Sequence, residues 1–350
     1  MQRPVMNPLF TDDVAPVERQ RFVRTRVVLR MGWRCVKILL RDPFRPEGKL
    51  RIEDGTPLQR LVRGVGYRLA FAPVLLVLFV VALVFAGTRP MPKLVAELDP
   101  VSVGVYYDPV EFLSSDETRV QAWLVPVIDA KRVLEHGSNL LQAKYPAVVL
   151  AHDFGASRQQ MLPLVKPLHE AGFVVLVVAL RGSGTDSAVG QTFGLNEALD
   201  LTAAIDLLRK RPFVDPARIG VVGVGTGANA ALICADHDVR LSAVVLHEPV
   251  KTSTDAIRKW VGPRQSWLAW VDPLCLWTFE IAYGLDAEDI EPVRYAQTER
   301  RLPVLRTGAS AAHLFHKTWM RDVESFLHQH LDPAHDGLSL PHVAAGVGER

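Results

Sequence analysis

A strand that leads through a glycine-rich turn into a helix is the feature of this sequence best suited to chemistry. The stretch RIGVVGVGTGANAAL (218–232) passes from β-branched residues through Gly223-Val224-Gly225-Thr226-Gly227 into a helix-forming segment. In the pattern G-x-S-x-G, such a turn lifts a serine hydroxyl above the edge of a sheet for nucleophilic attack. Gly225 stands at the serine position, so the hydroxyl is missing. Glycine also tolerates the strained backbone of this turn better than serine.

Two further loops follow strand-like segments earlier in the chain. KYPAVVLAHDFGAS (144–157) ends a strand in His152-Asp153-Phe154-Gly155, and VALRGSGTDS (178–187) ends the next one. Thr226 carries the hydroxyl nearest the missing serine, but its side chain should point away from the apex of the turn. Arg181 and Asp186 in the second loop could contact a ligand.

The three loops, in this order and each after a strand, resemble those of the α/β-hydrolase superfamily, in particular serine hydrolases of the dienelactone hydrolase type. The resemblance covers most of residues 103–331, with a degenerate nucleophile elbow and with Asp153 in place of a glycine of the superfamily's oxyanion loop. An arginine in the second loop mostly holds loops together in this superfamily, so we expect that role for Arg181. It implies a doubly covered, mostly parallel sheet and an oxyanion hole formed by the N–H of Thr226 with that of Phe154 or Asp153. The ligand-binding residues expected on this basis are Asp153, Phe154, Gly225, Thr226 and His247.

The resemblance also shows what the sequence lacks. The superfamily's acid usually follows the strand that corresponds to 303–306, but the loop 308–312 has no carboxylate. Between this loop and a terminal helix at 318–331, the superfamily places another strand and the catalytic histidine, and the segment here is too short for both. No complete set of catalytic residues is therefore predicted. The candidates that could still take part in catalysis are Thr226, Glu248, His313 and His316.

The same glycines fit a second pattern. Gly223, Gly225 and Ala228 satisfy G-x-G-x-x-A after a strand, and Glu248 lies twenty residues beyond Ala228. This spacing is typical of dinucleotide-binding turns, in which the acid binds a ribose hydroxyl. The pattern normally opens its domain, whereas this one follows two hydrolase-like loops, so a dinucleotide-binding protein is kept as the second alternative.

Metal and disulfide chemistry have little support. His152-Asp153, Asp236-His237-Asp238 and the pair His313 and His316 lack the H-E-x-x-H or paired-cysteine spacing of a metal site. We therefore expect no metal and no cofactor. Cys234 and Cys275 could pair in an oxidising compartment, but Cys234 is better explained as a buried thiol on the helix after the elbow.

The body of the chain alternates strand and helix patterns. A hairpin is expected over 103–112 and 120–128, followed by strands at 147–151, 174–179, 219–222 and 243–246. The intervening helices are predicted near 159–171, 195–211 and 227–236, an arrangement typical of a parallel sheet covered on both faces. Residues 251–300 break this rhythm, hold four of the seven tryptophans, and are interpreted as an inserted helical cap.

One segment is long and apolar enough to cross a membrane. LAFAPVLLVLFVVALVFA (69–86) has no charged residue, and 18 residues of helix span about 27 Å, close to the thickness of a bilayer core. Arg60, Arg63 and Arg68 precede it, whereas Arg89 and Lys93 follow. This bias predicts a cell-membrane protein with a cytoplasmic N-terminus and an extracytoplasmic body. A buried core helix or a cleaved signal sequence is the alternative.

Charge divides the chain into a basic head and a mildly acidic body. Residues 1–68 hold 15 Lys or Arg against 7 Asp or Glu, although the net charge of the chain is only +2. Within the head, 17–40 has the spacing of a basic amphipathic helix, which suits anionic lipid better than nucleic acid. The expected organisation is a head at 1–68, a transmembrane helix at 69–87, a linker at 88–102, the hydrolase-like domain at 103–331 and a disordered tail at 332–350.

These observations lead to one principal hypothesis and an enzymatic alternative. The chain is interpreted as a membrane-anchored α/β-hydrolase-like protein that has lost the serine mechanism and binds a small molecule or a protein through the retained pocket. The alternative is an active hydrolase of ester or amide bonds with a non-standard nucleophile. Membrane lipid is the second expected partner, and nucleic acid is not expected.

Overall fold

The computed structural model describes residues 57–89, 98–127, 143–183, 189–238, 240–261, 266–308 and 315–331. The head before residue 57, including the amphipathic segment at 17–40, and the tail after residue 331 lie outside these residues. The strands are β1 (Asp108–Leu113), β2 (Arg119–Val125), β3 (Tyr145–Ala151), β4 (Val174–Ala179), β5 (Val214–Val224), β6 (Ala243–His247) and β7 (Val304–Thr307). The α-helices are α2 (Pro57–Gly87), α4 (Leu162–Glu170), α5 (Glu197–Arg209), α6 (Thr226–His237), α7 (Ser253–Trp260), α8 (Asp272–Tyr283), α9 (Ala296–Arg301) and α10 (Lys317–Leu331).

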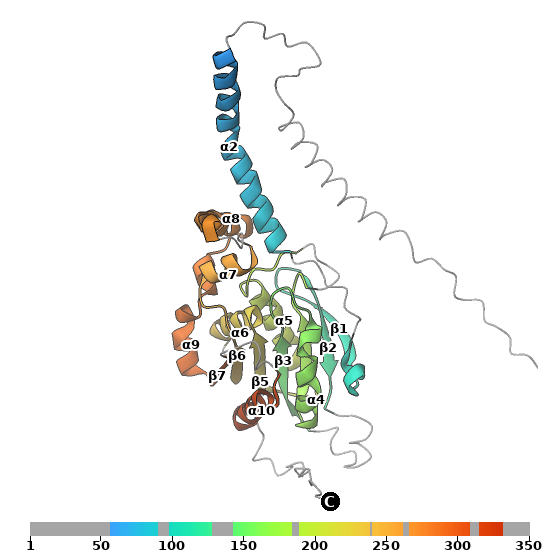
Figure 1. The fold of residues 1–350 in the computed structure, drawn as a ribbon. Coiled ribbons are helices and arrows are strands. Elements are labelled where there is room, and N and C mark those ends of the chain that lie inside the picture. The colour runs from blue at the N-terminus through green and yellow to red at the C-terminus, as the bar shows by residue number, and fades with distance from the viewer. Residues whose placement is uncertain are drawn as a thin grey trace, which may run out of the picture. The chain divides into compact units, whose positions relative to one another are not determined.

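The seven strands form one sheet in the order β1-β2-β4-β3-β5-β6-β7 (Figure 1). β2 pairs antiparallel with both β1 and β4, whereas β4, β3, β5, β6 and β7 run parallel to one another. The leading hairpin and the mostly parallel sheet that the sequence predicted are confirmed. β5 lies inside the sheet between β3 and β6, so the turn that follows it is flanked by the ends of two parallel strands.

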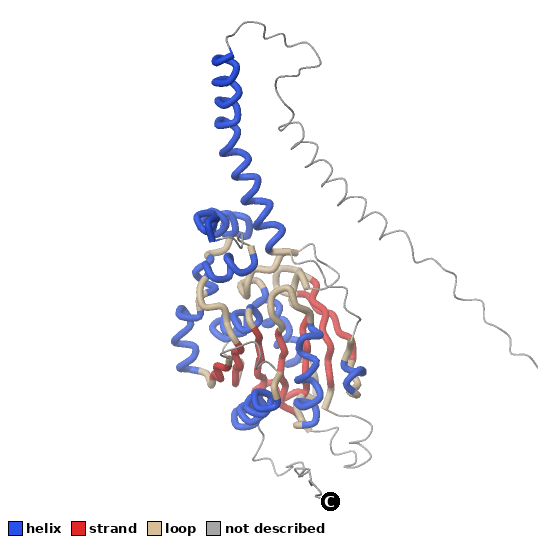
Figure 2. Tube along the Cα trace, in the orientation of Figure 1, coloured by secondary structure: helices blue, strands red, loops and turns tan. Residues whose placement is uncertain are grey.

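Helices cover both faces of the sheet (Figure 2). α5 and α6 pack on one face, and α4 and α10 pack on the other. β3 shows the reason: Ala147 and Val149 belong to the core under α5 and α6, whereas Val148 and Leu150 belong to the core under α4 and α10. Because successive side chains of a strand point to opposite faces, a strand buried on both faces must be apolar throughout.

The hairpin begins later than expected. Residues Pro100–Val103 form a short 3-10 turn, η1, in which the Asp99 side chain accepts a hydrogen bond from the Ser102 N–H at 3.1 Å. Gly104 then reverses the chain at φ 79°. A capping aspartate followed by proline favours a helical turn over a strand, and β1 consequently starts at Asp108.

Helices occupy the segment between β6 and β7 that the sequence set apart. α7, α8 and α9 lie there with the 3-10 turns η4 (Ser266–Val271), η5 (Ala287–Ile290) and η6 (Pro292–Tyr295). We call this helical segment the cap. Asn229 on α6 ties it to the elbow side of the sheet, because its side-chain amide donates to the backbone oxygens of Val250 at 3.0 Å and Ile290 at 2.7 Å.

Among the described residues, α2 is the one helix with a stretch long and apolar enough to cross a membrane, at Arg68–Gly87, by length and composition. The helix begins at Pro57, before the apolar segment that starts at residue 69, and Pro73 lies inside it. Proline suits the first helical position, which explains the earlier start. Residues up to Leu75 and residues from Leu76 onward belong to two separate compact units.

The last turns of α2 pack within the second unit. Val80 and Val84 are buried in an apolar cluster with Phe154, Phe193 and Phe279, which we call the cap cluster. This cluster joins parts of the chain that are far apart in sequence: the end of α2, the loop after β3, the segment before α5, and helices α7 and α8 of the cap.

Candidate functional site

The turn after β5 has the sharp backbone of a nucleophile elbow, with glycine at its apex. Gly225 adopts φ 57° and ψ −118° between β5 and α6. Its N–H donates to the backbone oxygen of His247, at the end of the neighbouring strand β6, at 2.8 Å. Residues other than glycine rarely adopt this backbone conformation, because it is strained, and those that do are concentrated at functional sites. Glycine therefore keeps the shape of the elbow without that strain.

The carboxylate of Asp153 lies where a side chain at position 225 would begin. A Cβ atom built on Gly225 would fall 2.0 Å from Asp153 Oδ1 and 2.2 Å from Asp153 Cγ. Non-bonded carbon and oxygen atoms do not approach this closely, so position 225 has no room for a side chain while Asp153 stays in place. The serine hydroxyl is thus missing, and the Asp153 carboxylate fills the space that a serine side chain would need.

The same carboxylate occupies the oxyanion hole. Asp153 Oδ1 accepts hydrogen bonds from the backbone N–H of Phe154 at 2.7 Å and of Thr226 at 2.9 Å. The Thr226 N–H lies in the first turn of α6, where unpaired N–H groups and the helix dipole favour negative charge. The sequence left two donors open, Phe154 and Asp153, and the geometry selects Phe154. The Asp153 N–H is not available, because it donates to Gln160 Oε1 at 2.8 Å.

His152 fixes the loop that carries Asp153. Its Nε2 accepts a hydrogen bond from the Leu180 N–H at 3.2 Å, so its Nδ1 carries the proton and donates to the Asp153 backbone oxygen at 2.8 Å. The imidazole is fully buried, and burial lowers its pKa to about 4. His152 is therefore neutral near pH 7 and joins the loop after β3 to the loop after β4.

Two predicted site residues lie at the end of β6, His247 and Glu248. His247 contacts the elbow through its backbone oxygen, which accepts the Gly225 N–H. The His247 ring is buried with Nδ1 3.1 Å from Thr307 Oγ1, and it packs edge-on against Trp319. Burial lowers its pKa. The Glu248 side chain lies against Gly308, where an added Cβ would come within 2.5 Å of Glu248 Cγ. Across the described part of the chain, no hydrogen bond joins either side chain to the elbow.

Among the described residues, the other catalytic candidates do not form a catalytic triad. Thr226 is buried and contributes its backbone N–H to the site. His316 is exposed, with Nδ1 2.9 Å from Thr318 Oγ1 at the start of α10. His313 lies outside the described residues. The structure thus brings Asp153, Phe154, Gly225 and Thr226 together and leaves Glu248 and His316 apart from them.

Arg181, in the loop after β4, holds this end of the sheet together. Its guanidinium is buried and bonds Asp200 on α5 at 2.6 Å and Asp116 in the β1–β2 turn at 2.6 Å. The arginine lowers the pKa of the Asp116 carboxyl to about 2. These contacts agree with the structural role expected for Arg181, while Asp186 falls outside the described residues.

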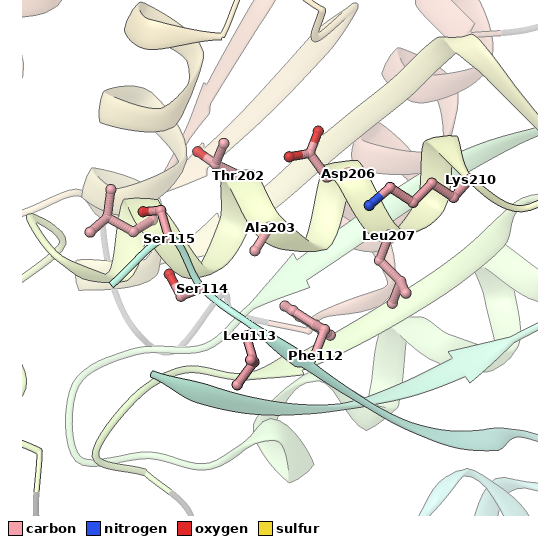
Figure 3. A pocket seen from close by; sticks show the side chains of 10 residues that line it. Phe112, Leu113, Ser114, Ser115, Thr202, Ala203, Asp206, Leu207 and Lys210 are labelled. Atoms are coloured by element: carbon pink, nitrogen blue, oxygen red, sulfur yellow. The ribbon is translucent and has the colours of Figure 1, made fainter. Parts of the chain in front are cut away.

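A cavity of about 320 Å³ lies away from the elbow, between the end of β1 with its following turn and helix α5 (Figure 3). Asp206 on α5 and Lys210 just after that helix border the cavity on one side, and Phe112 and Leu113 of β1 border it on the other. None of its lining residues belongs to the elbow or to the loop after β3, so it is distinct from the predicted ligand site.

The described residues contain no group of three or more histidine, cysteine or carboxylate side chains placed to hold a metal ion. Cys234 and Cys275 are both buried free thiols, so the pairing left open by the sequence does not form. Burial raises the pKa of Cys234 to about 12 and that of Cys275 to about 11. Both thiols are therefore protonated at neutral pH.

Sequence reasoning missed the role of the Asp153 side chain. It noted two departures from the superfamily's motifs separately, aspartate at 153 and glycine at 225. They are one feature in space, because only glycine at 225 leaves room for a carboxylate that reaches the oxyanion hole from position 153. The paired departures are the signal that could have revealed it.

The amino-acid sequence is similar to those of known proteins. Residues 136–263 match the model of the Dienelactone hydrolase family, a stretch that contains all three loops. The chain is 26% identical over 151 residues to the thiohydrolase aneE of Aspergillus aculeatus, covering 42% of this chain and 43% of that protein. It is 28% identical over 139 residues to the uncharacterized protein YfhR of Escherichia coli O157:H7, covering 39% and 45%. The chain thus spans less than half the length of these relatives.

Solved structures include the esterase Pf2001 of Pyrococcus furiosus, with a TM-score of 0.49 and 18% identity, covering 70% of this chain and 98% of that one. The family match and the observed sheet order together confirm the resemblance that the three loops indicated.

Proposed function

We propose that this chain, a member of the α/β-hydrolase superfamily, is a membrane-anchored protein that has lost ester and amide hydrolysis and binds a ligand or protein partner at the remodelled elbow. The observation that carries this proposal is the Asp153 carboxylate, which fills both the space of the missing side chain and the oxyanion hole. Acyl transfer by the serine mechanism needs a nucleophile and free oxyanion donors, and each such donor contributes about 100- to 1000-fold to the rate.

Asp153 is a poor replacement for the missing serine. If its carboxylate attacked an acyl carbon, the new oxyanion would need the N–H groups of Phe154 and Thr226. Both already donate to Asp153 Oδ1. This argument weighs against the alternative of an active ester or amide hydrolase with an unusual nucleophile.

The free oxygen of Asp153 supports a ligand class. Asp153 is half-buried, and no hydrogen bond to its Oδ2 is found among the described residues. An ionised carboxylate only accepts hydrogen bonds. The site therefore favours a ligand that presents a hydroxyl, amine or amide N–H, whereas an unmodified oxyanion hole favours an acceptor.

The dinucleotide pattern of Gly223, Gly225 and Ala228 has less support. A pyrophosphate binds such a turn through N–H groups at the start of the following helix. Here the Thr226 N–H faces the Asp153 carboxylate at 2.9 Å, and a phosphate would meet that negative charge. The elbow also follows the fifth strand in chain order.

Membrane anchoring rests on α2. The stretch Arg68–Gly87 has the length and hydropathy of a spanning helix, and the arginines before it favour a cytoplasmic N-terminus. In this arrangement the hydrolase-like domain is extracytoplasmic. The basic head would contact anionic lipid at the cytoplasmic surface.

An activity assay tests the proposal. The full chain, purified in mild detergent, is incubated with 4-nitrophenyl butyrate and with a fluorescent fluorophosphonate that labels activated serines. We expect turnover equal to buffer and no labelling. Turnover that is lost in Thr226→Ala, Glu248→Gln or His316→Ala would overturn the proposal and restore the enzymatic alternative.

A double variant tests whether a hydroxyl and free oxyanion donors are enough to restore the reaction. Asp153→Gly combined with Gly225→Ser supplies the hydroxyl and frees the oxyanion donors at once. We expect slow labelling at most, because no histidine and acid are assembled beside the elbow among the described residues. Gly225→Ser alone keeps the blocking carboxylate and should gain nothing.

A further inference from the structure

A stripe of large apolar side chains is exposed on α8 and on the turn before it. Trp270, Leu274, Trp277 and Ile281 follow one another at intervals of four, three and four residues, the spacing of one helix face. Their exposed fractions are 57%, 36%, 62% and 63%. We call these four residues the α8 stripe.

The α8 helix is apolar on both sides. Its inner face places Cys275 and Phe279 in the cap cluster, where both are fully buried. The two acids of the helix do not contribute charge to the stripe: Asp272 is buried and pairs with Arg258 at 3.0 Å, and Glu280 accepts the Ala287 N–H at 3.3 Å. A helix at a water-exposed surface normally carries charged or polar residues on its outer face. The outer face of this helix is therefore suited to an apolar environment outside the protein.

The end of α2 and the inner face of α8 meet in the cap cluster. Val80 and Val84 lie in the same cluster as Phe279, and the Tyr283 hydroxyl donates to Thr88 Oγ1 at 2.7 Å. At 1.5 Å of rise per residue, Val80 and Val84 lie about 10 Å and about 5 Å before Gly87, the last residue of the candidate span. Helices that lie in a membrane surface bury their apolar face by about 5–10 Å.

We propose that the α8 stripe lies in the boundary between the lipid headgroups and acyl chains of the bilayer that α2 crosses; this rests on the proposed anchoring. Trp270 and Trp277 then take the interfacial position that tryptophan favours. The lipid surface is the occupant that the structure favours, because α8 shares the cap cluster with Val80 and Val84 of α2, near the end of the candidate span.

The loop that carries Asp153 contacts the same cap cluster as α8. Phe154, whose N–H binds Asp153, has its ring in the cap cluster, stacked on Phe193 with ring centroids 5.0 Å apart. The cap cluster separates the α8 stripe from the loop that carries Asp153. A ligand of the elbow would therefore approach beside the membrane surface.

Site-specific quenching tests this inference in the full chain. Cys35 is replaced by serine, the buried Cys234 and Cys275 are kept, and single cysteines are introduced by Trp277→Cys, Ile281→Cys, Leu78→Cys or Val293→Cys. Each variant is labelled with a small environment-sensitive fluorophore and reconstituted into phosphatidylcholine–phosphatidylglycerol vesicles that contain lipids with a nitroxide near the headgroup and lipids with a nitroxide along the acyl chain. Leu78 reports α2 itself, and Val293, which is 73% exposed on the cap, is the matched control.

We expect labels at 277, 281 and 78 to lose most of their emission and the label at 293 to keep it. Quenching at 78 without quenching at 277 and 281 would overturn the α8 proposal and leave the anchoring intact, with a protein surface as the occupant of the stripe. Absence of quenching at 78 would overturn the anchoring, and the α8 proposal with it. Equal quenching at 293 would also overturn the proposal, because α8 would then not be distinguished from the rest of the cap.

Discussion

A single methyl group at position 225 should destabilise the protein through Asp153. The Cβ of Gly225→Ala would fall 2.0 Å from Asp153 Oδ1, so the carboxylate must leave its two N–H donors. The backbone at φ 57° and ψ −118° costs about 1–3 kcal/mol for a residue other than glycine. Partial loss of two hydrogen bonds to a charged group adds a comparable amount, so we expect a loss of about 4 kcal/mol in the free energy of unfolding.

Gly284 provides the matched control. It also has a positive φ, 64°, but an added Cβ there has no atom within 4 Å. Gly284→Ala should therefore cost only the left-handed backbone, about 1–2 kcal/mol. The difference between the two variants contains the collision with Asp153 together with the less favourable ψ of position 225, −118° against 33° at position 284.

A double-mutant cycle isolates that contact. Urea unfolding of the full chain in mild detergent, followed by tryptophan fluorescence, gives the free energies for wild type, Asp153→Gly, Gly225→Ala and the double variant. Once Asp153 is gone, Gly225→Ala should cost only the backbone strain, which gives a coupling of about 2 kcal/mol. The reasoning is refuted if Gly225→Ala costs no more than Gly284→Ala, or costs the same with and without Asp153.

Three other predictions concern the same fold. His152 has a folded pKa of about 4, below its usual 6.5. As the pH falls from about 6.5 to about 4, only the unfolded chain takes up the proton, and stability should fall by about 3 kcal/mol over that window. In His152→Gln, unfolding midpoints measured between pH 7 and pH 4.5 should fall less steeply, and an unchanged slope would contradict the assignment. Arg181→Met should cost about 3–5 kcal/mol because it leaves the buried Asp200 unpaired, whereas Arg294→Met, which removes exposed pairs, should leave the urea midpoint unchanged. Equal effects of the two arginine variants would count against the buried network. A membrane-impermeant maleimide applied to intact cells should label Leu340→Cys and leave Cys35 unlabelled, and the reverse pattern would invert the proposed orientation.

Local patterns in the sequence predicted most of the scaffold. The β-branched run of residues 147–151 became the doubly buried β3, and the glycine turn after residue 222 became a sharp elbow. Each depends on neighbouring residues, whose periodicity and backbone preferences are readable along the chain. The role of Arg181 in holding loops together also followed from the resemblance, and the structure adds its partners Asp116 and Asp200.

The content of the site depends on contacts between distant residues and could not be read in the same way. Asp153 and Thr226 are 73 positions apart, and their hydrogen bond follows from the parallel pairing of β3 with β5. Thr88 and Tyr283 are 195 positions apart. Composition and spacing carry no information on which side chains meet across such distances, and a conserved fold does not fix which groups occupy its site.

The central claim is that the oxyanion hole is intact and filled by Asp153. Thermal unfolding of wild type and Asp153→Gly in sodium formate, against sodium chloride at equal concentration, tests it most directly. If the claim holds, formate replaces the lost carboxylate on the N–H groups of Phe154 and Thr226 and raises the midpoint of Asp153→Gly above its value in chloride. The wild type should show no difference between the two salts. Equal responses to formate in both proteins, or no response in Asp153→Gly, would contradict the account.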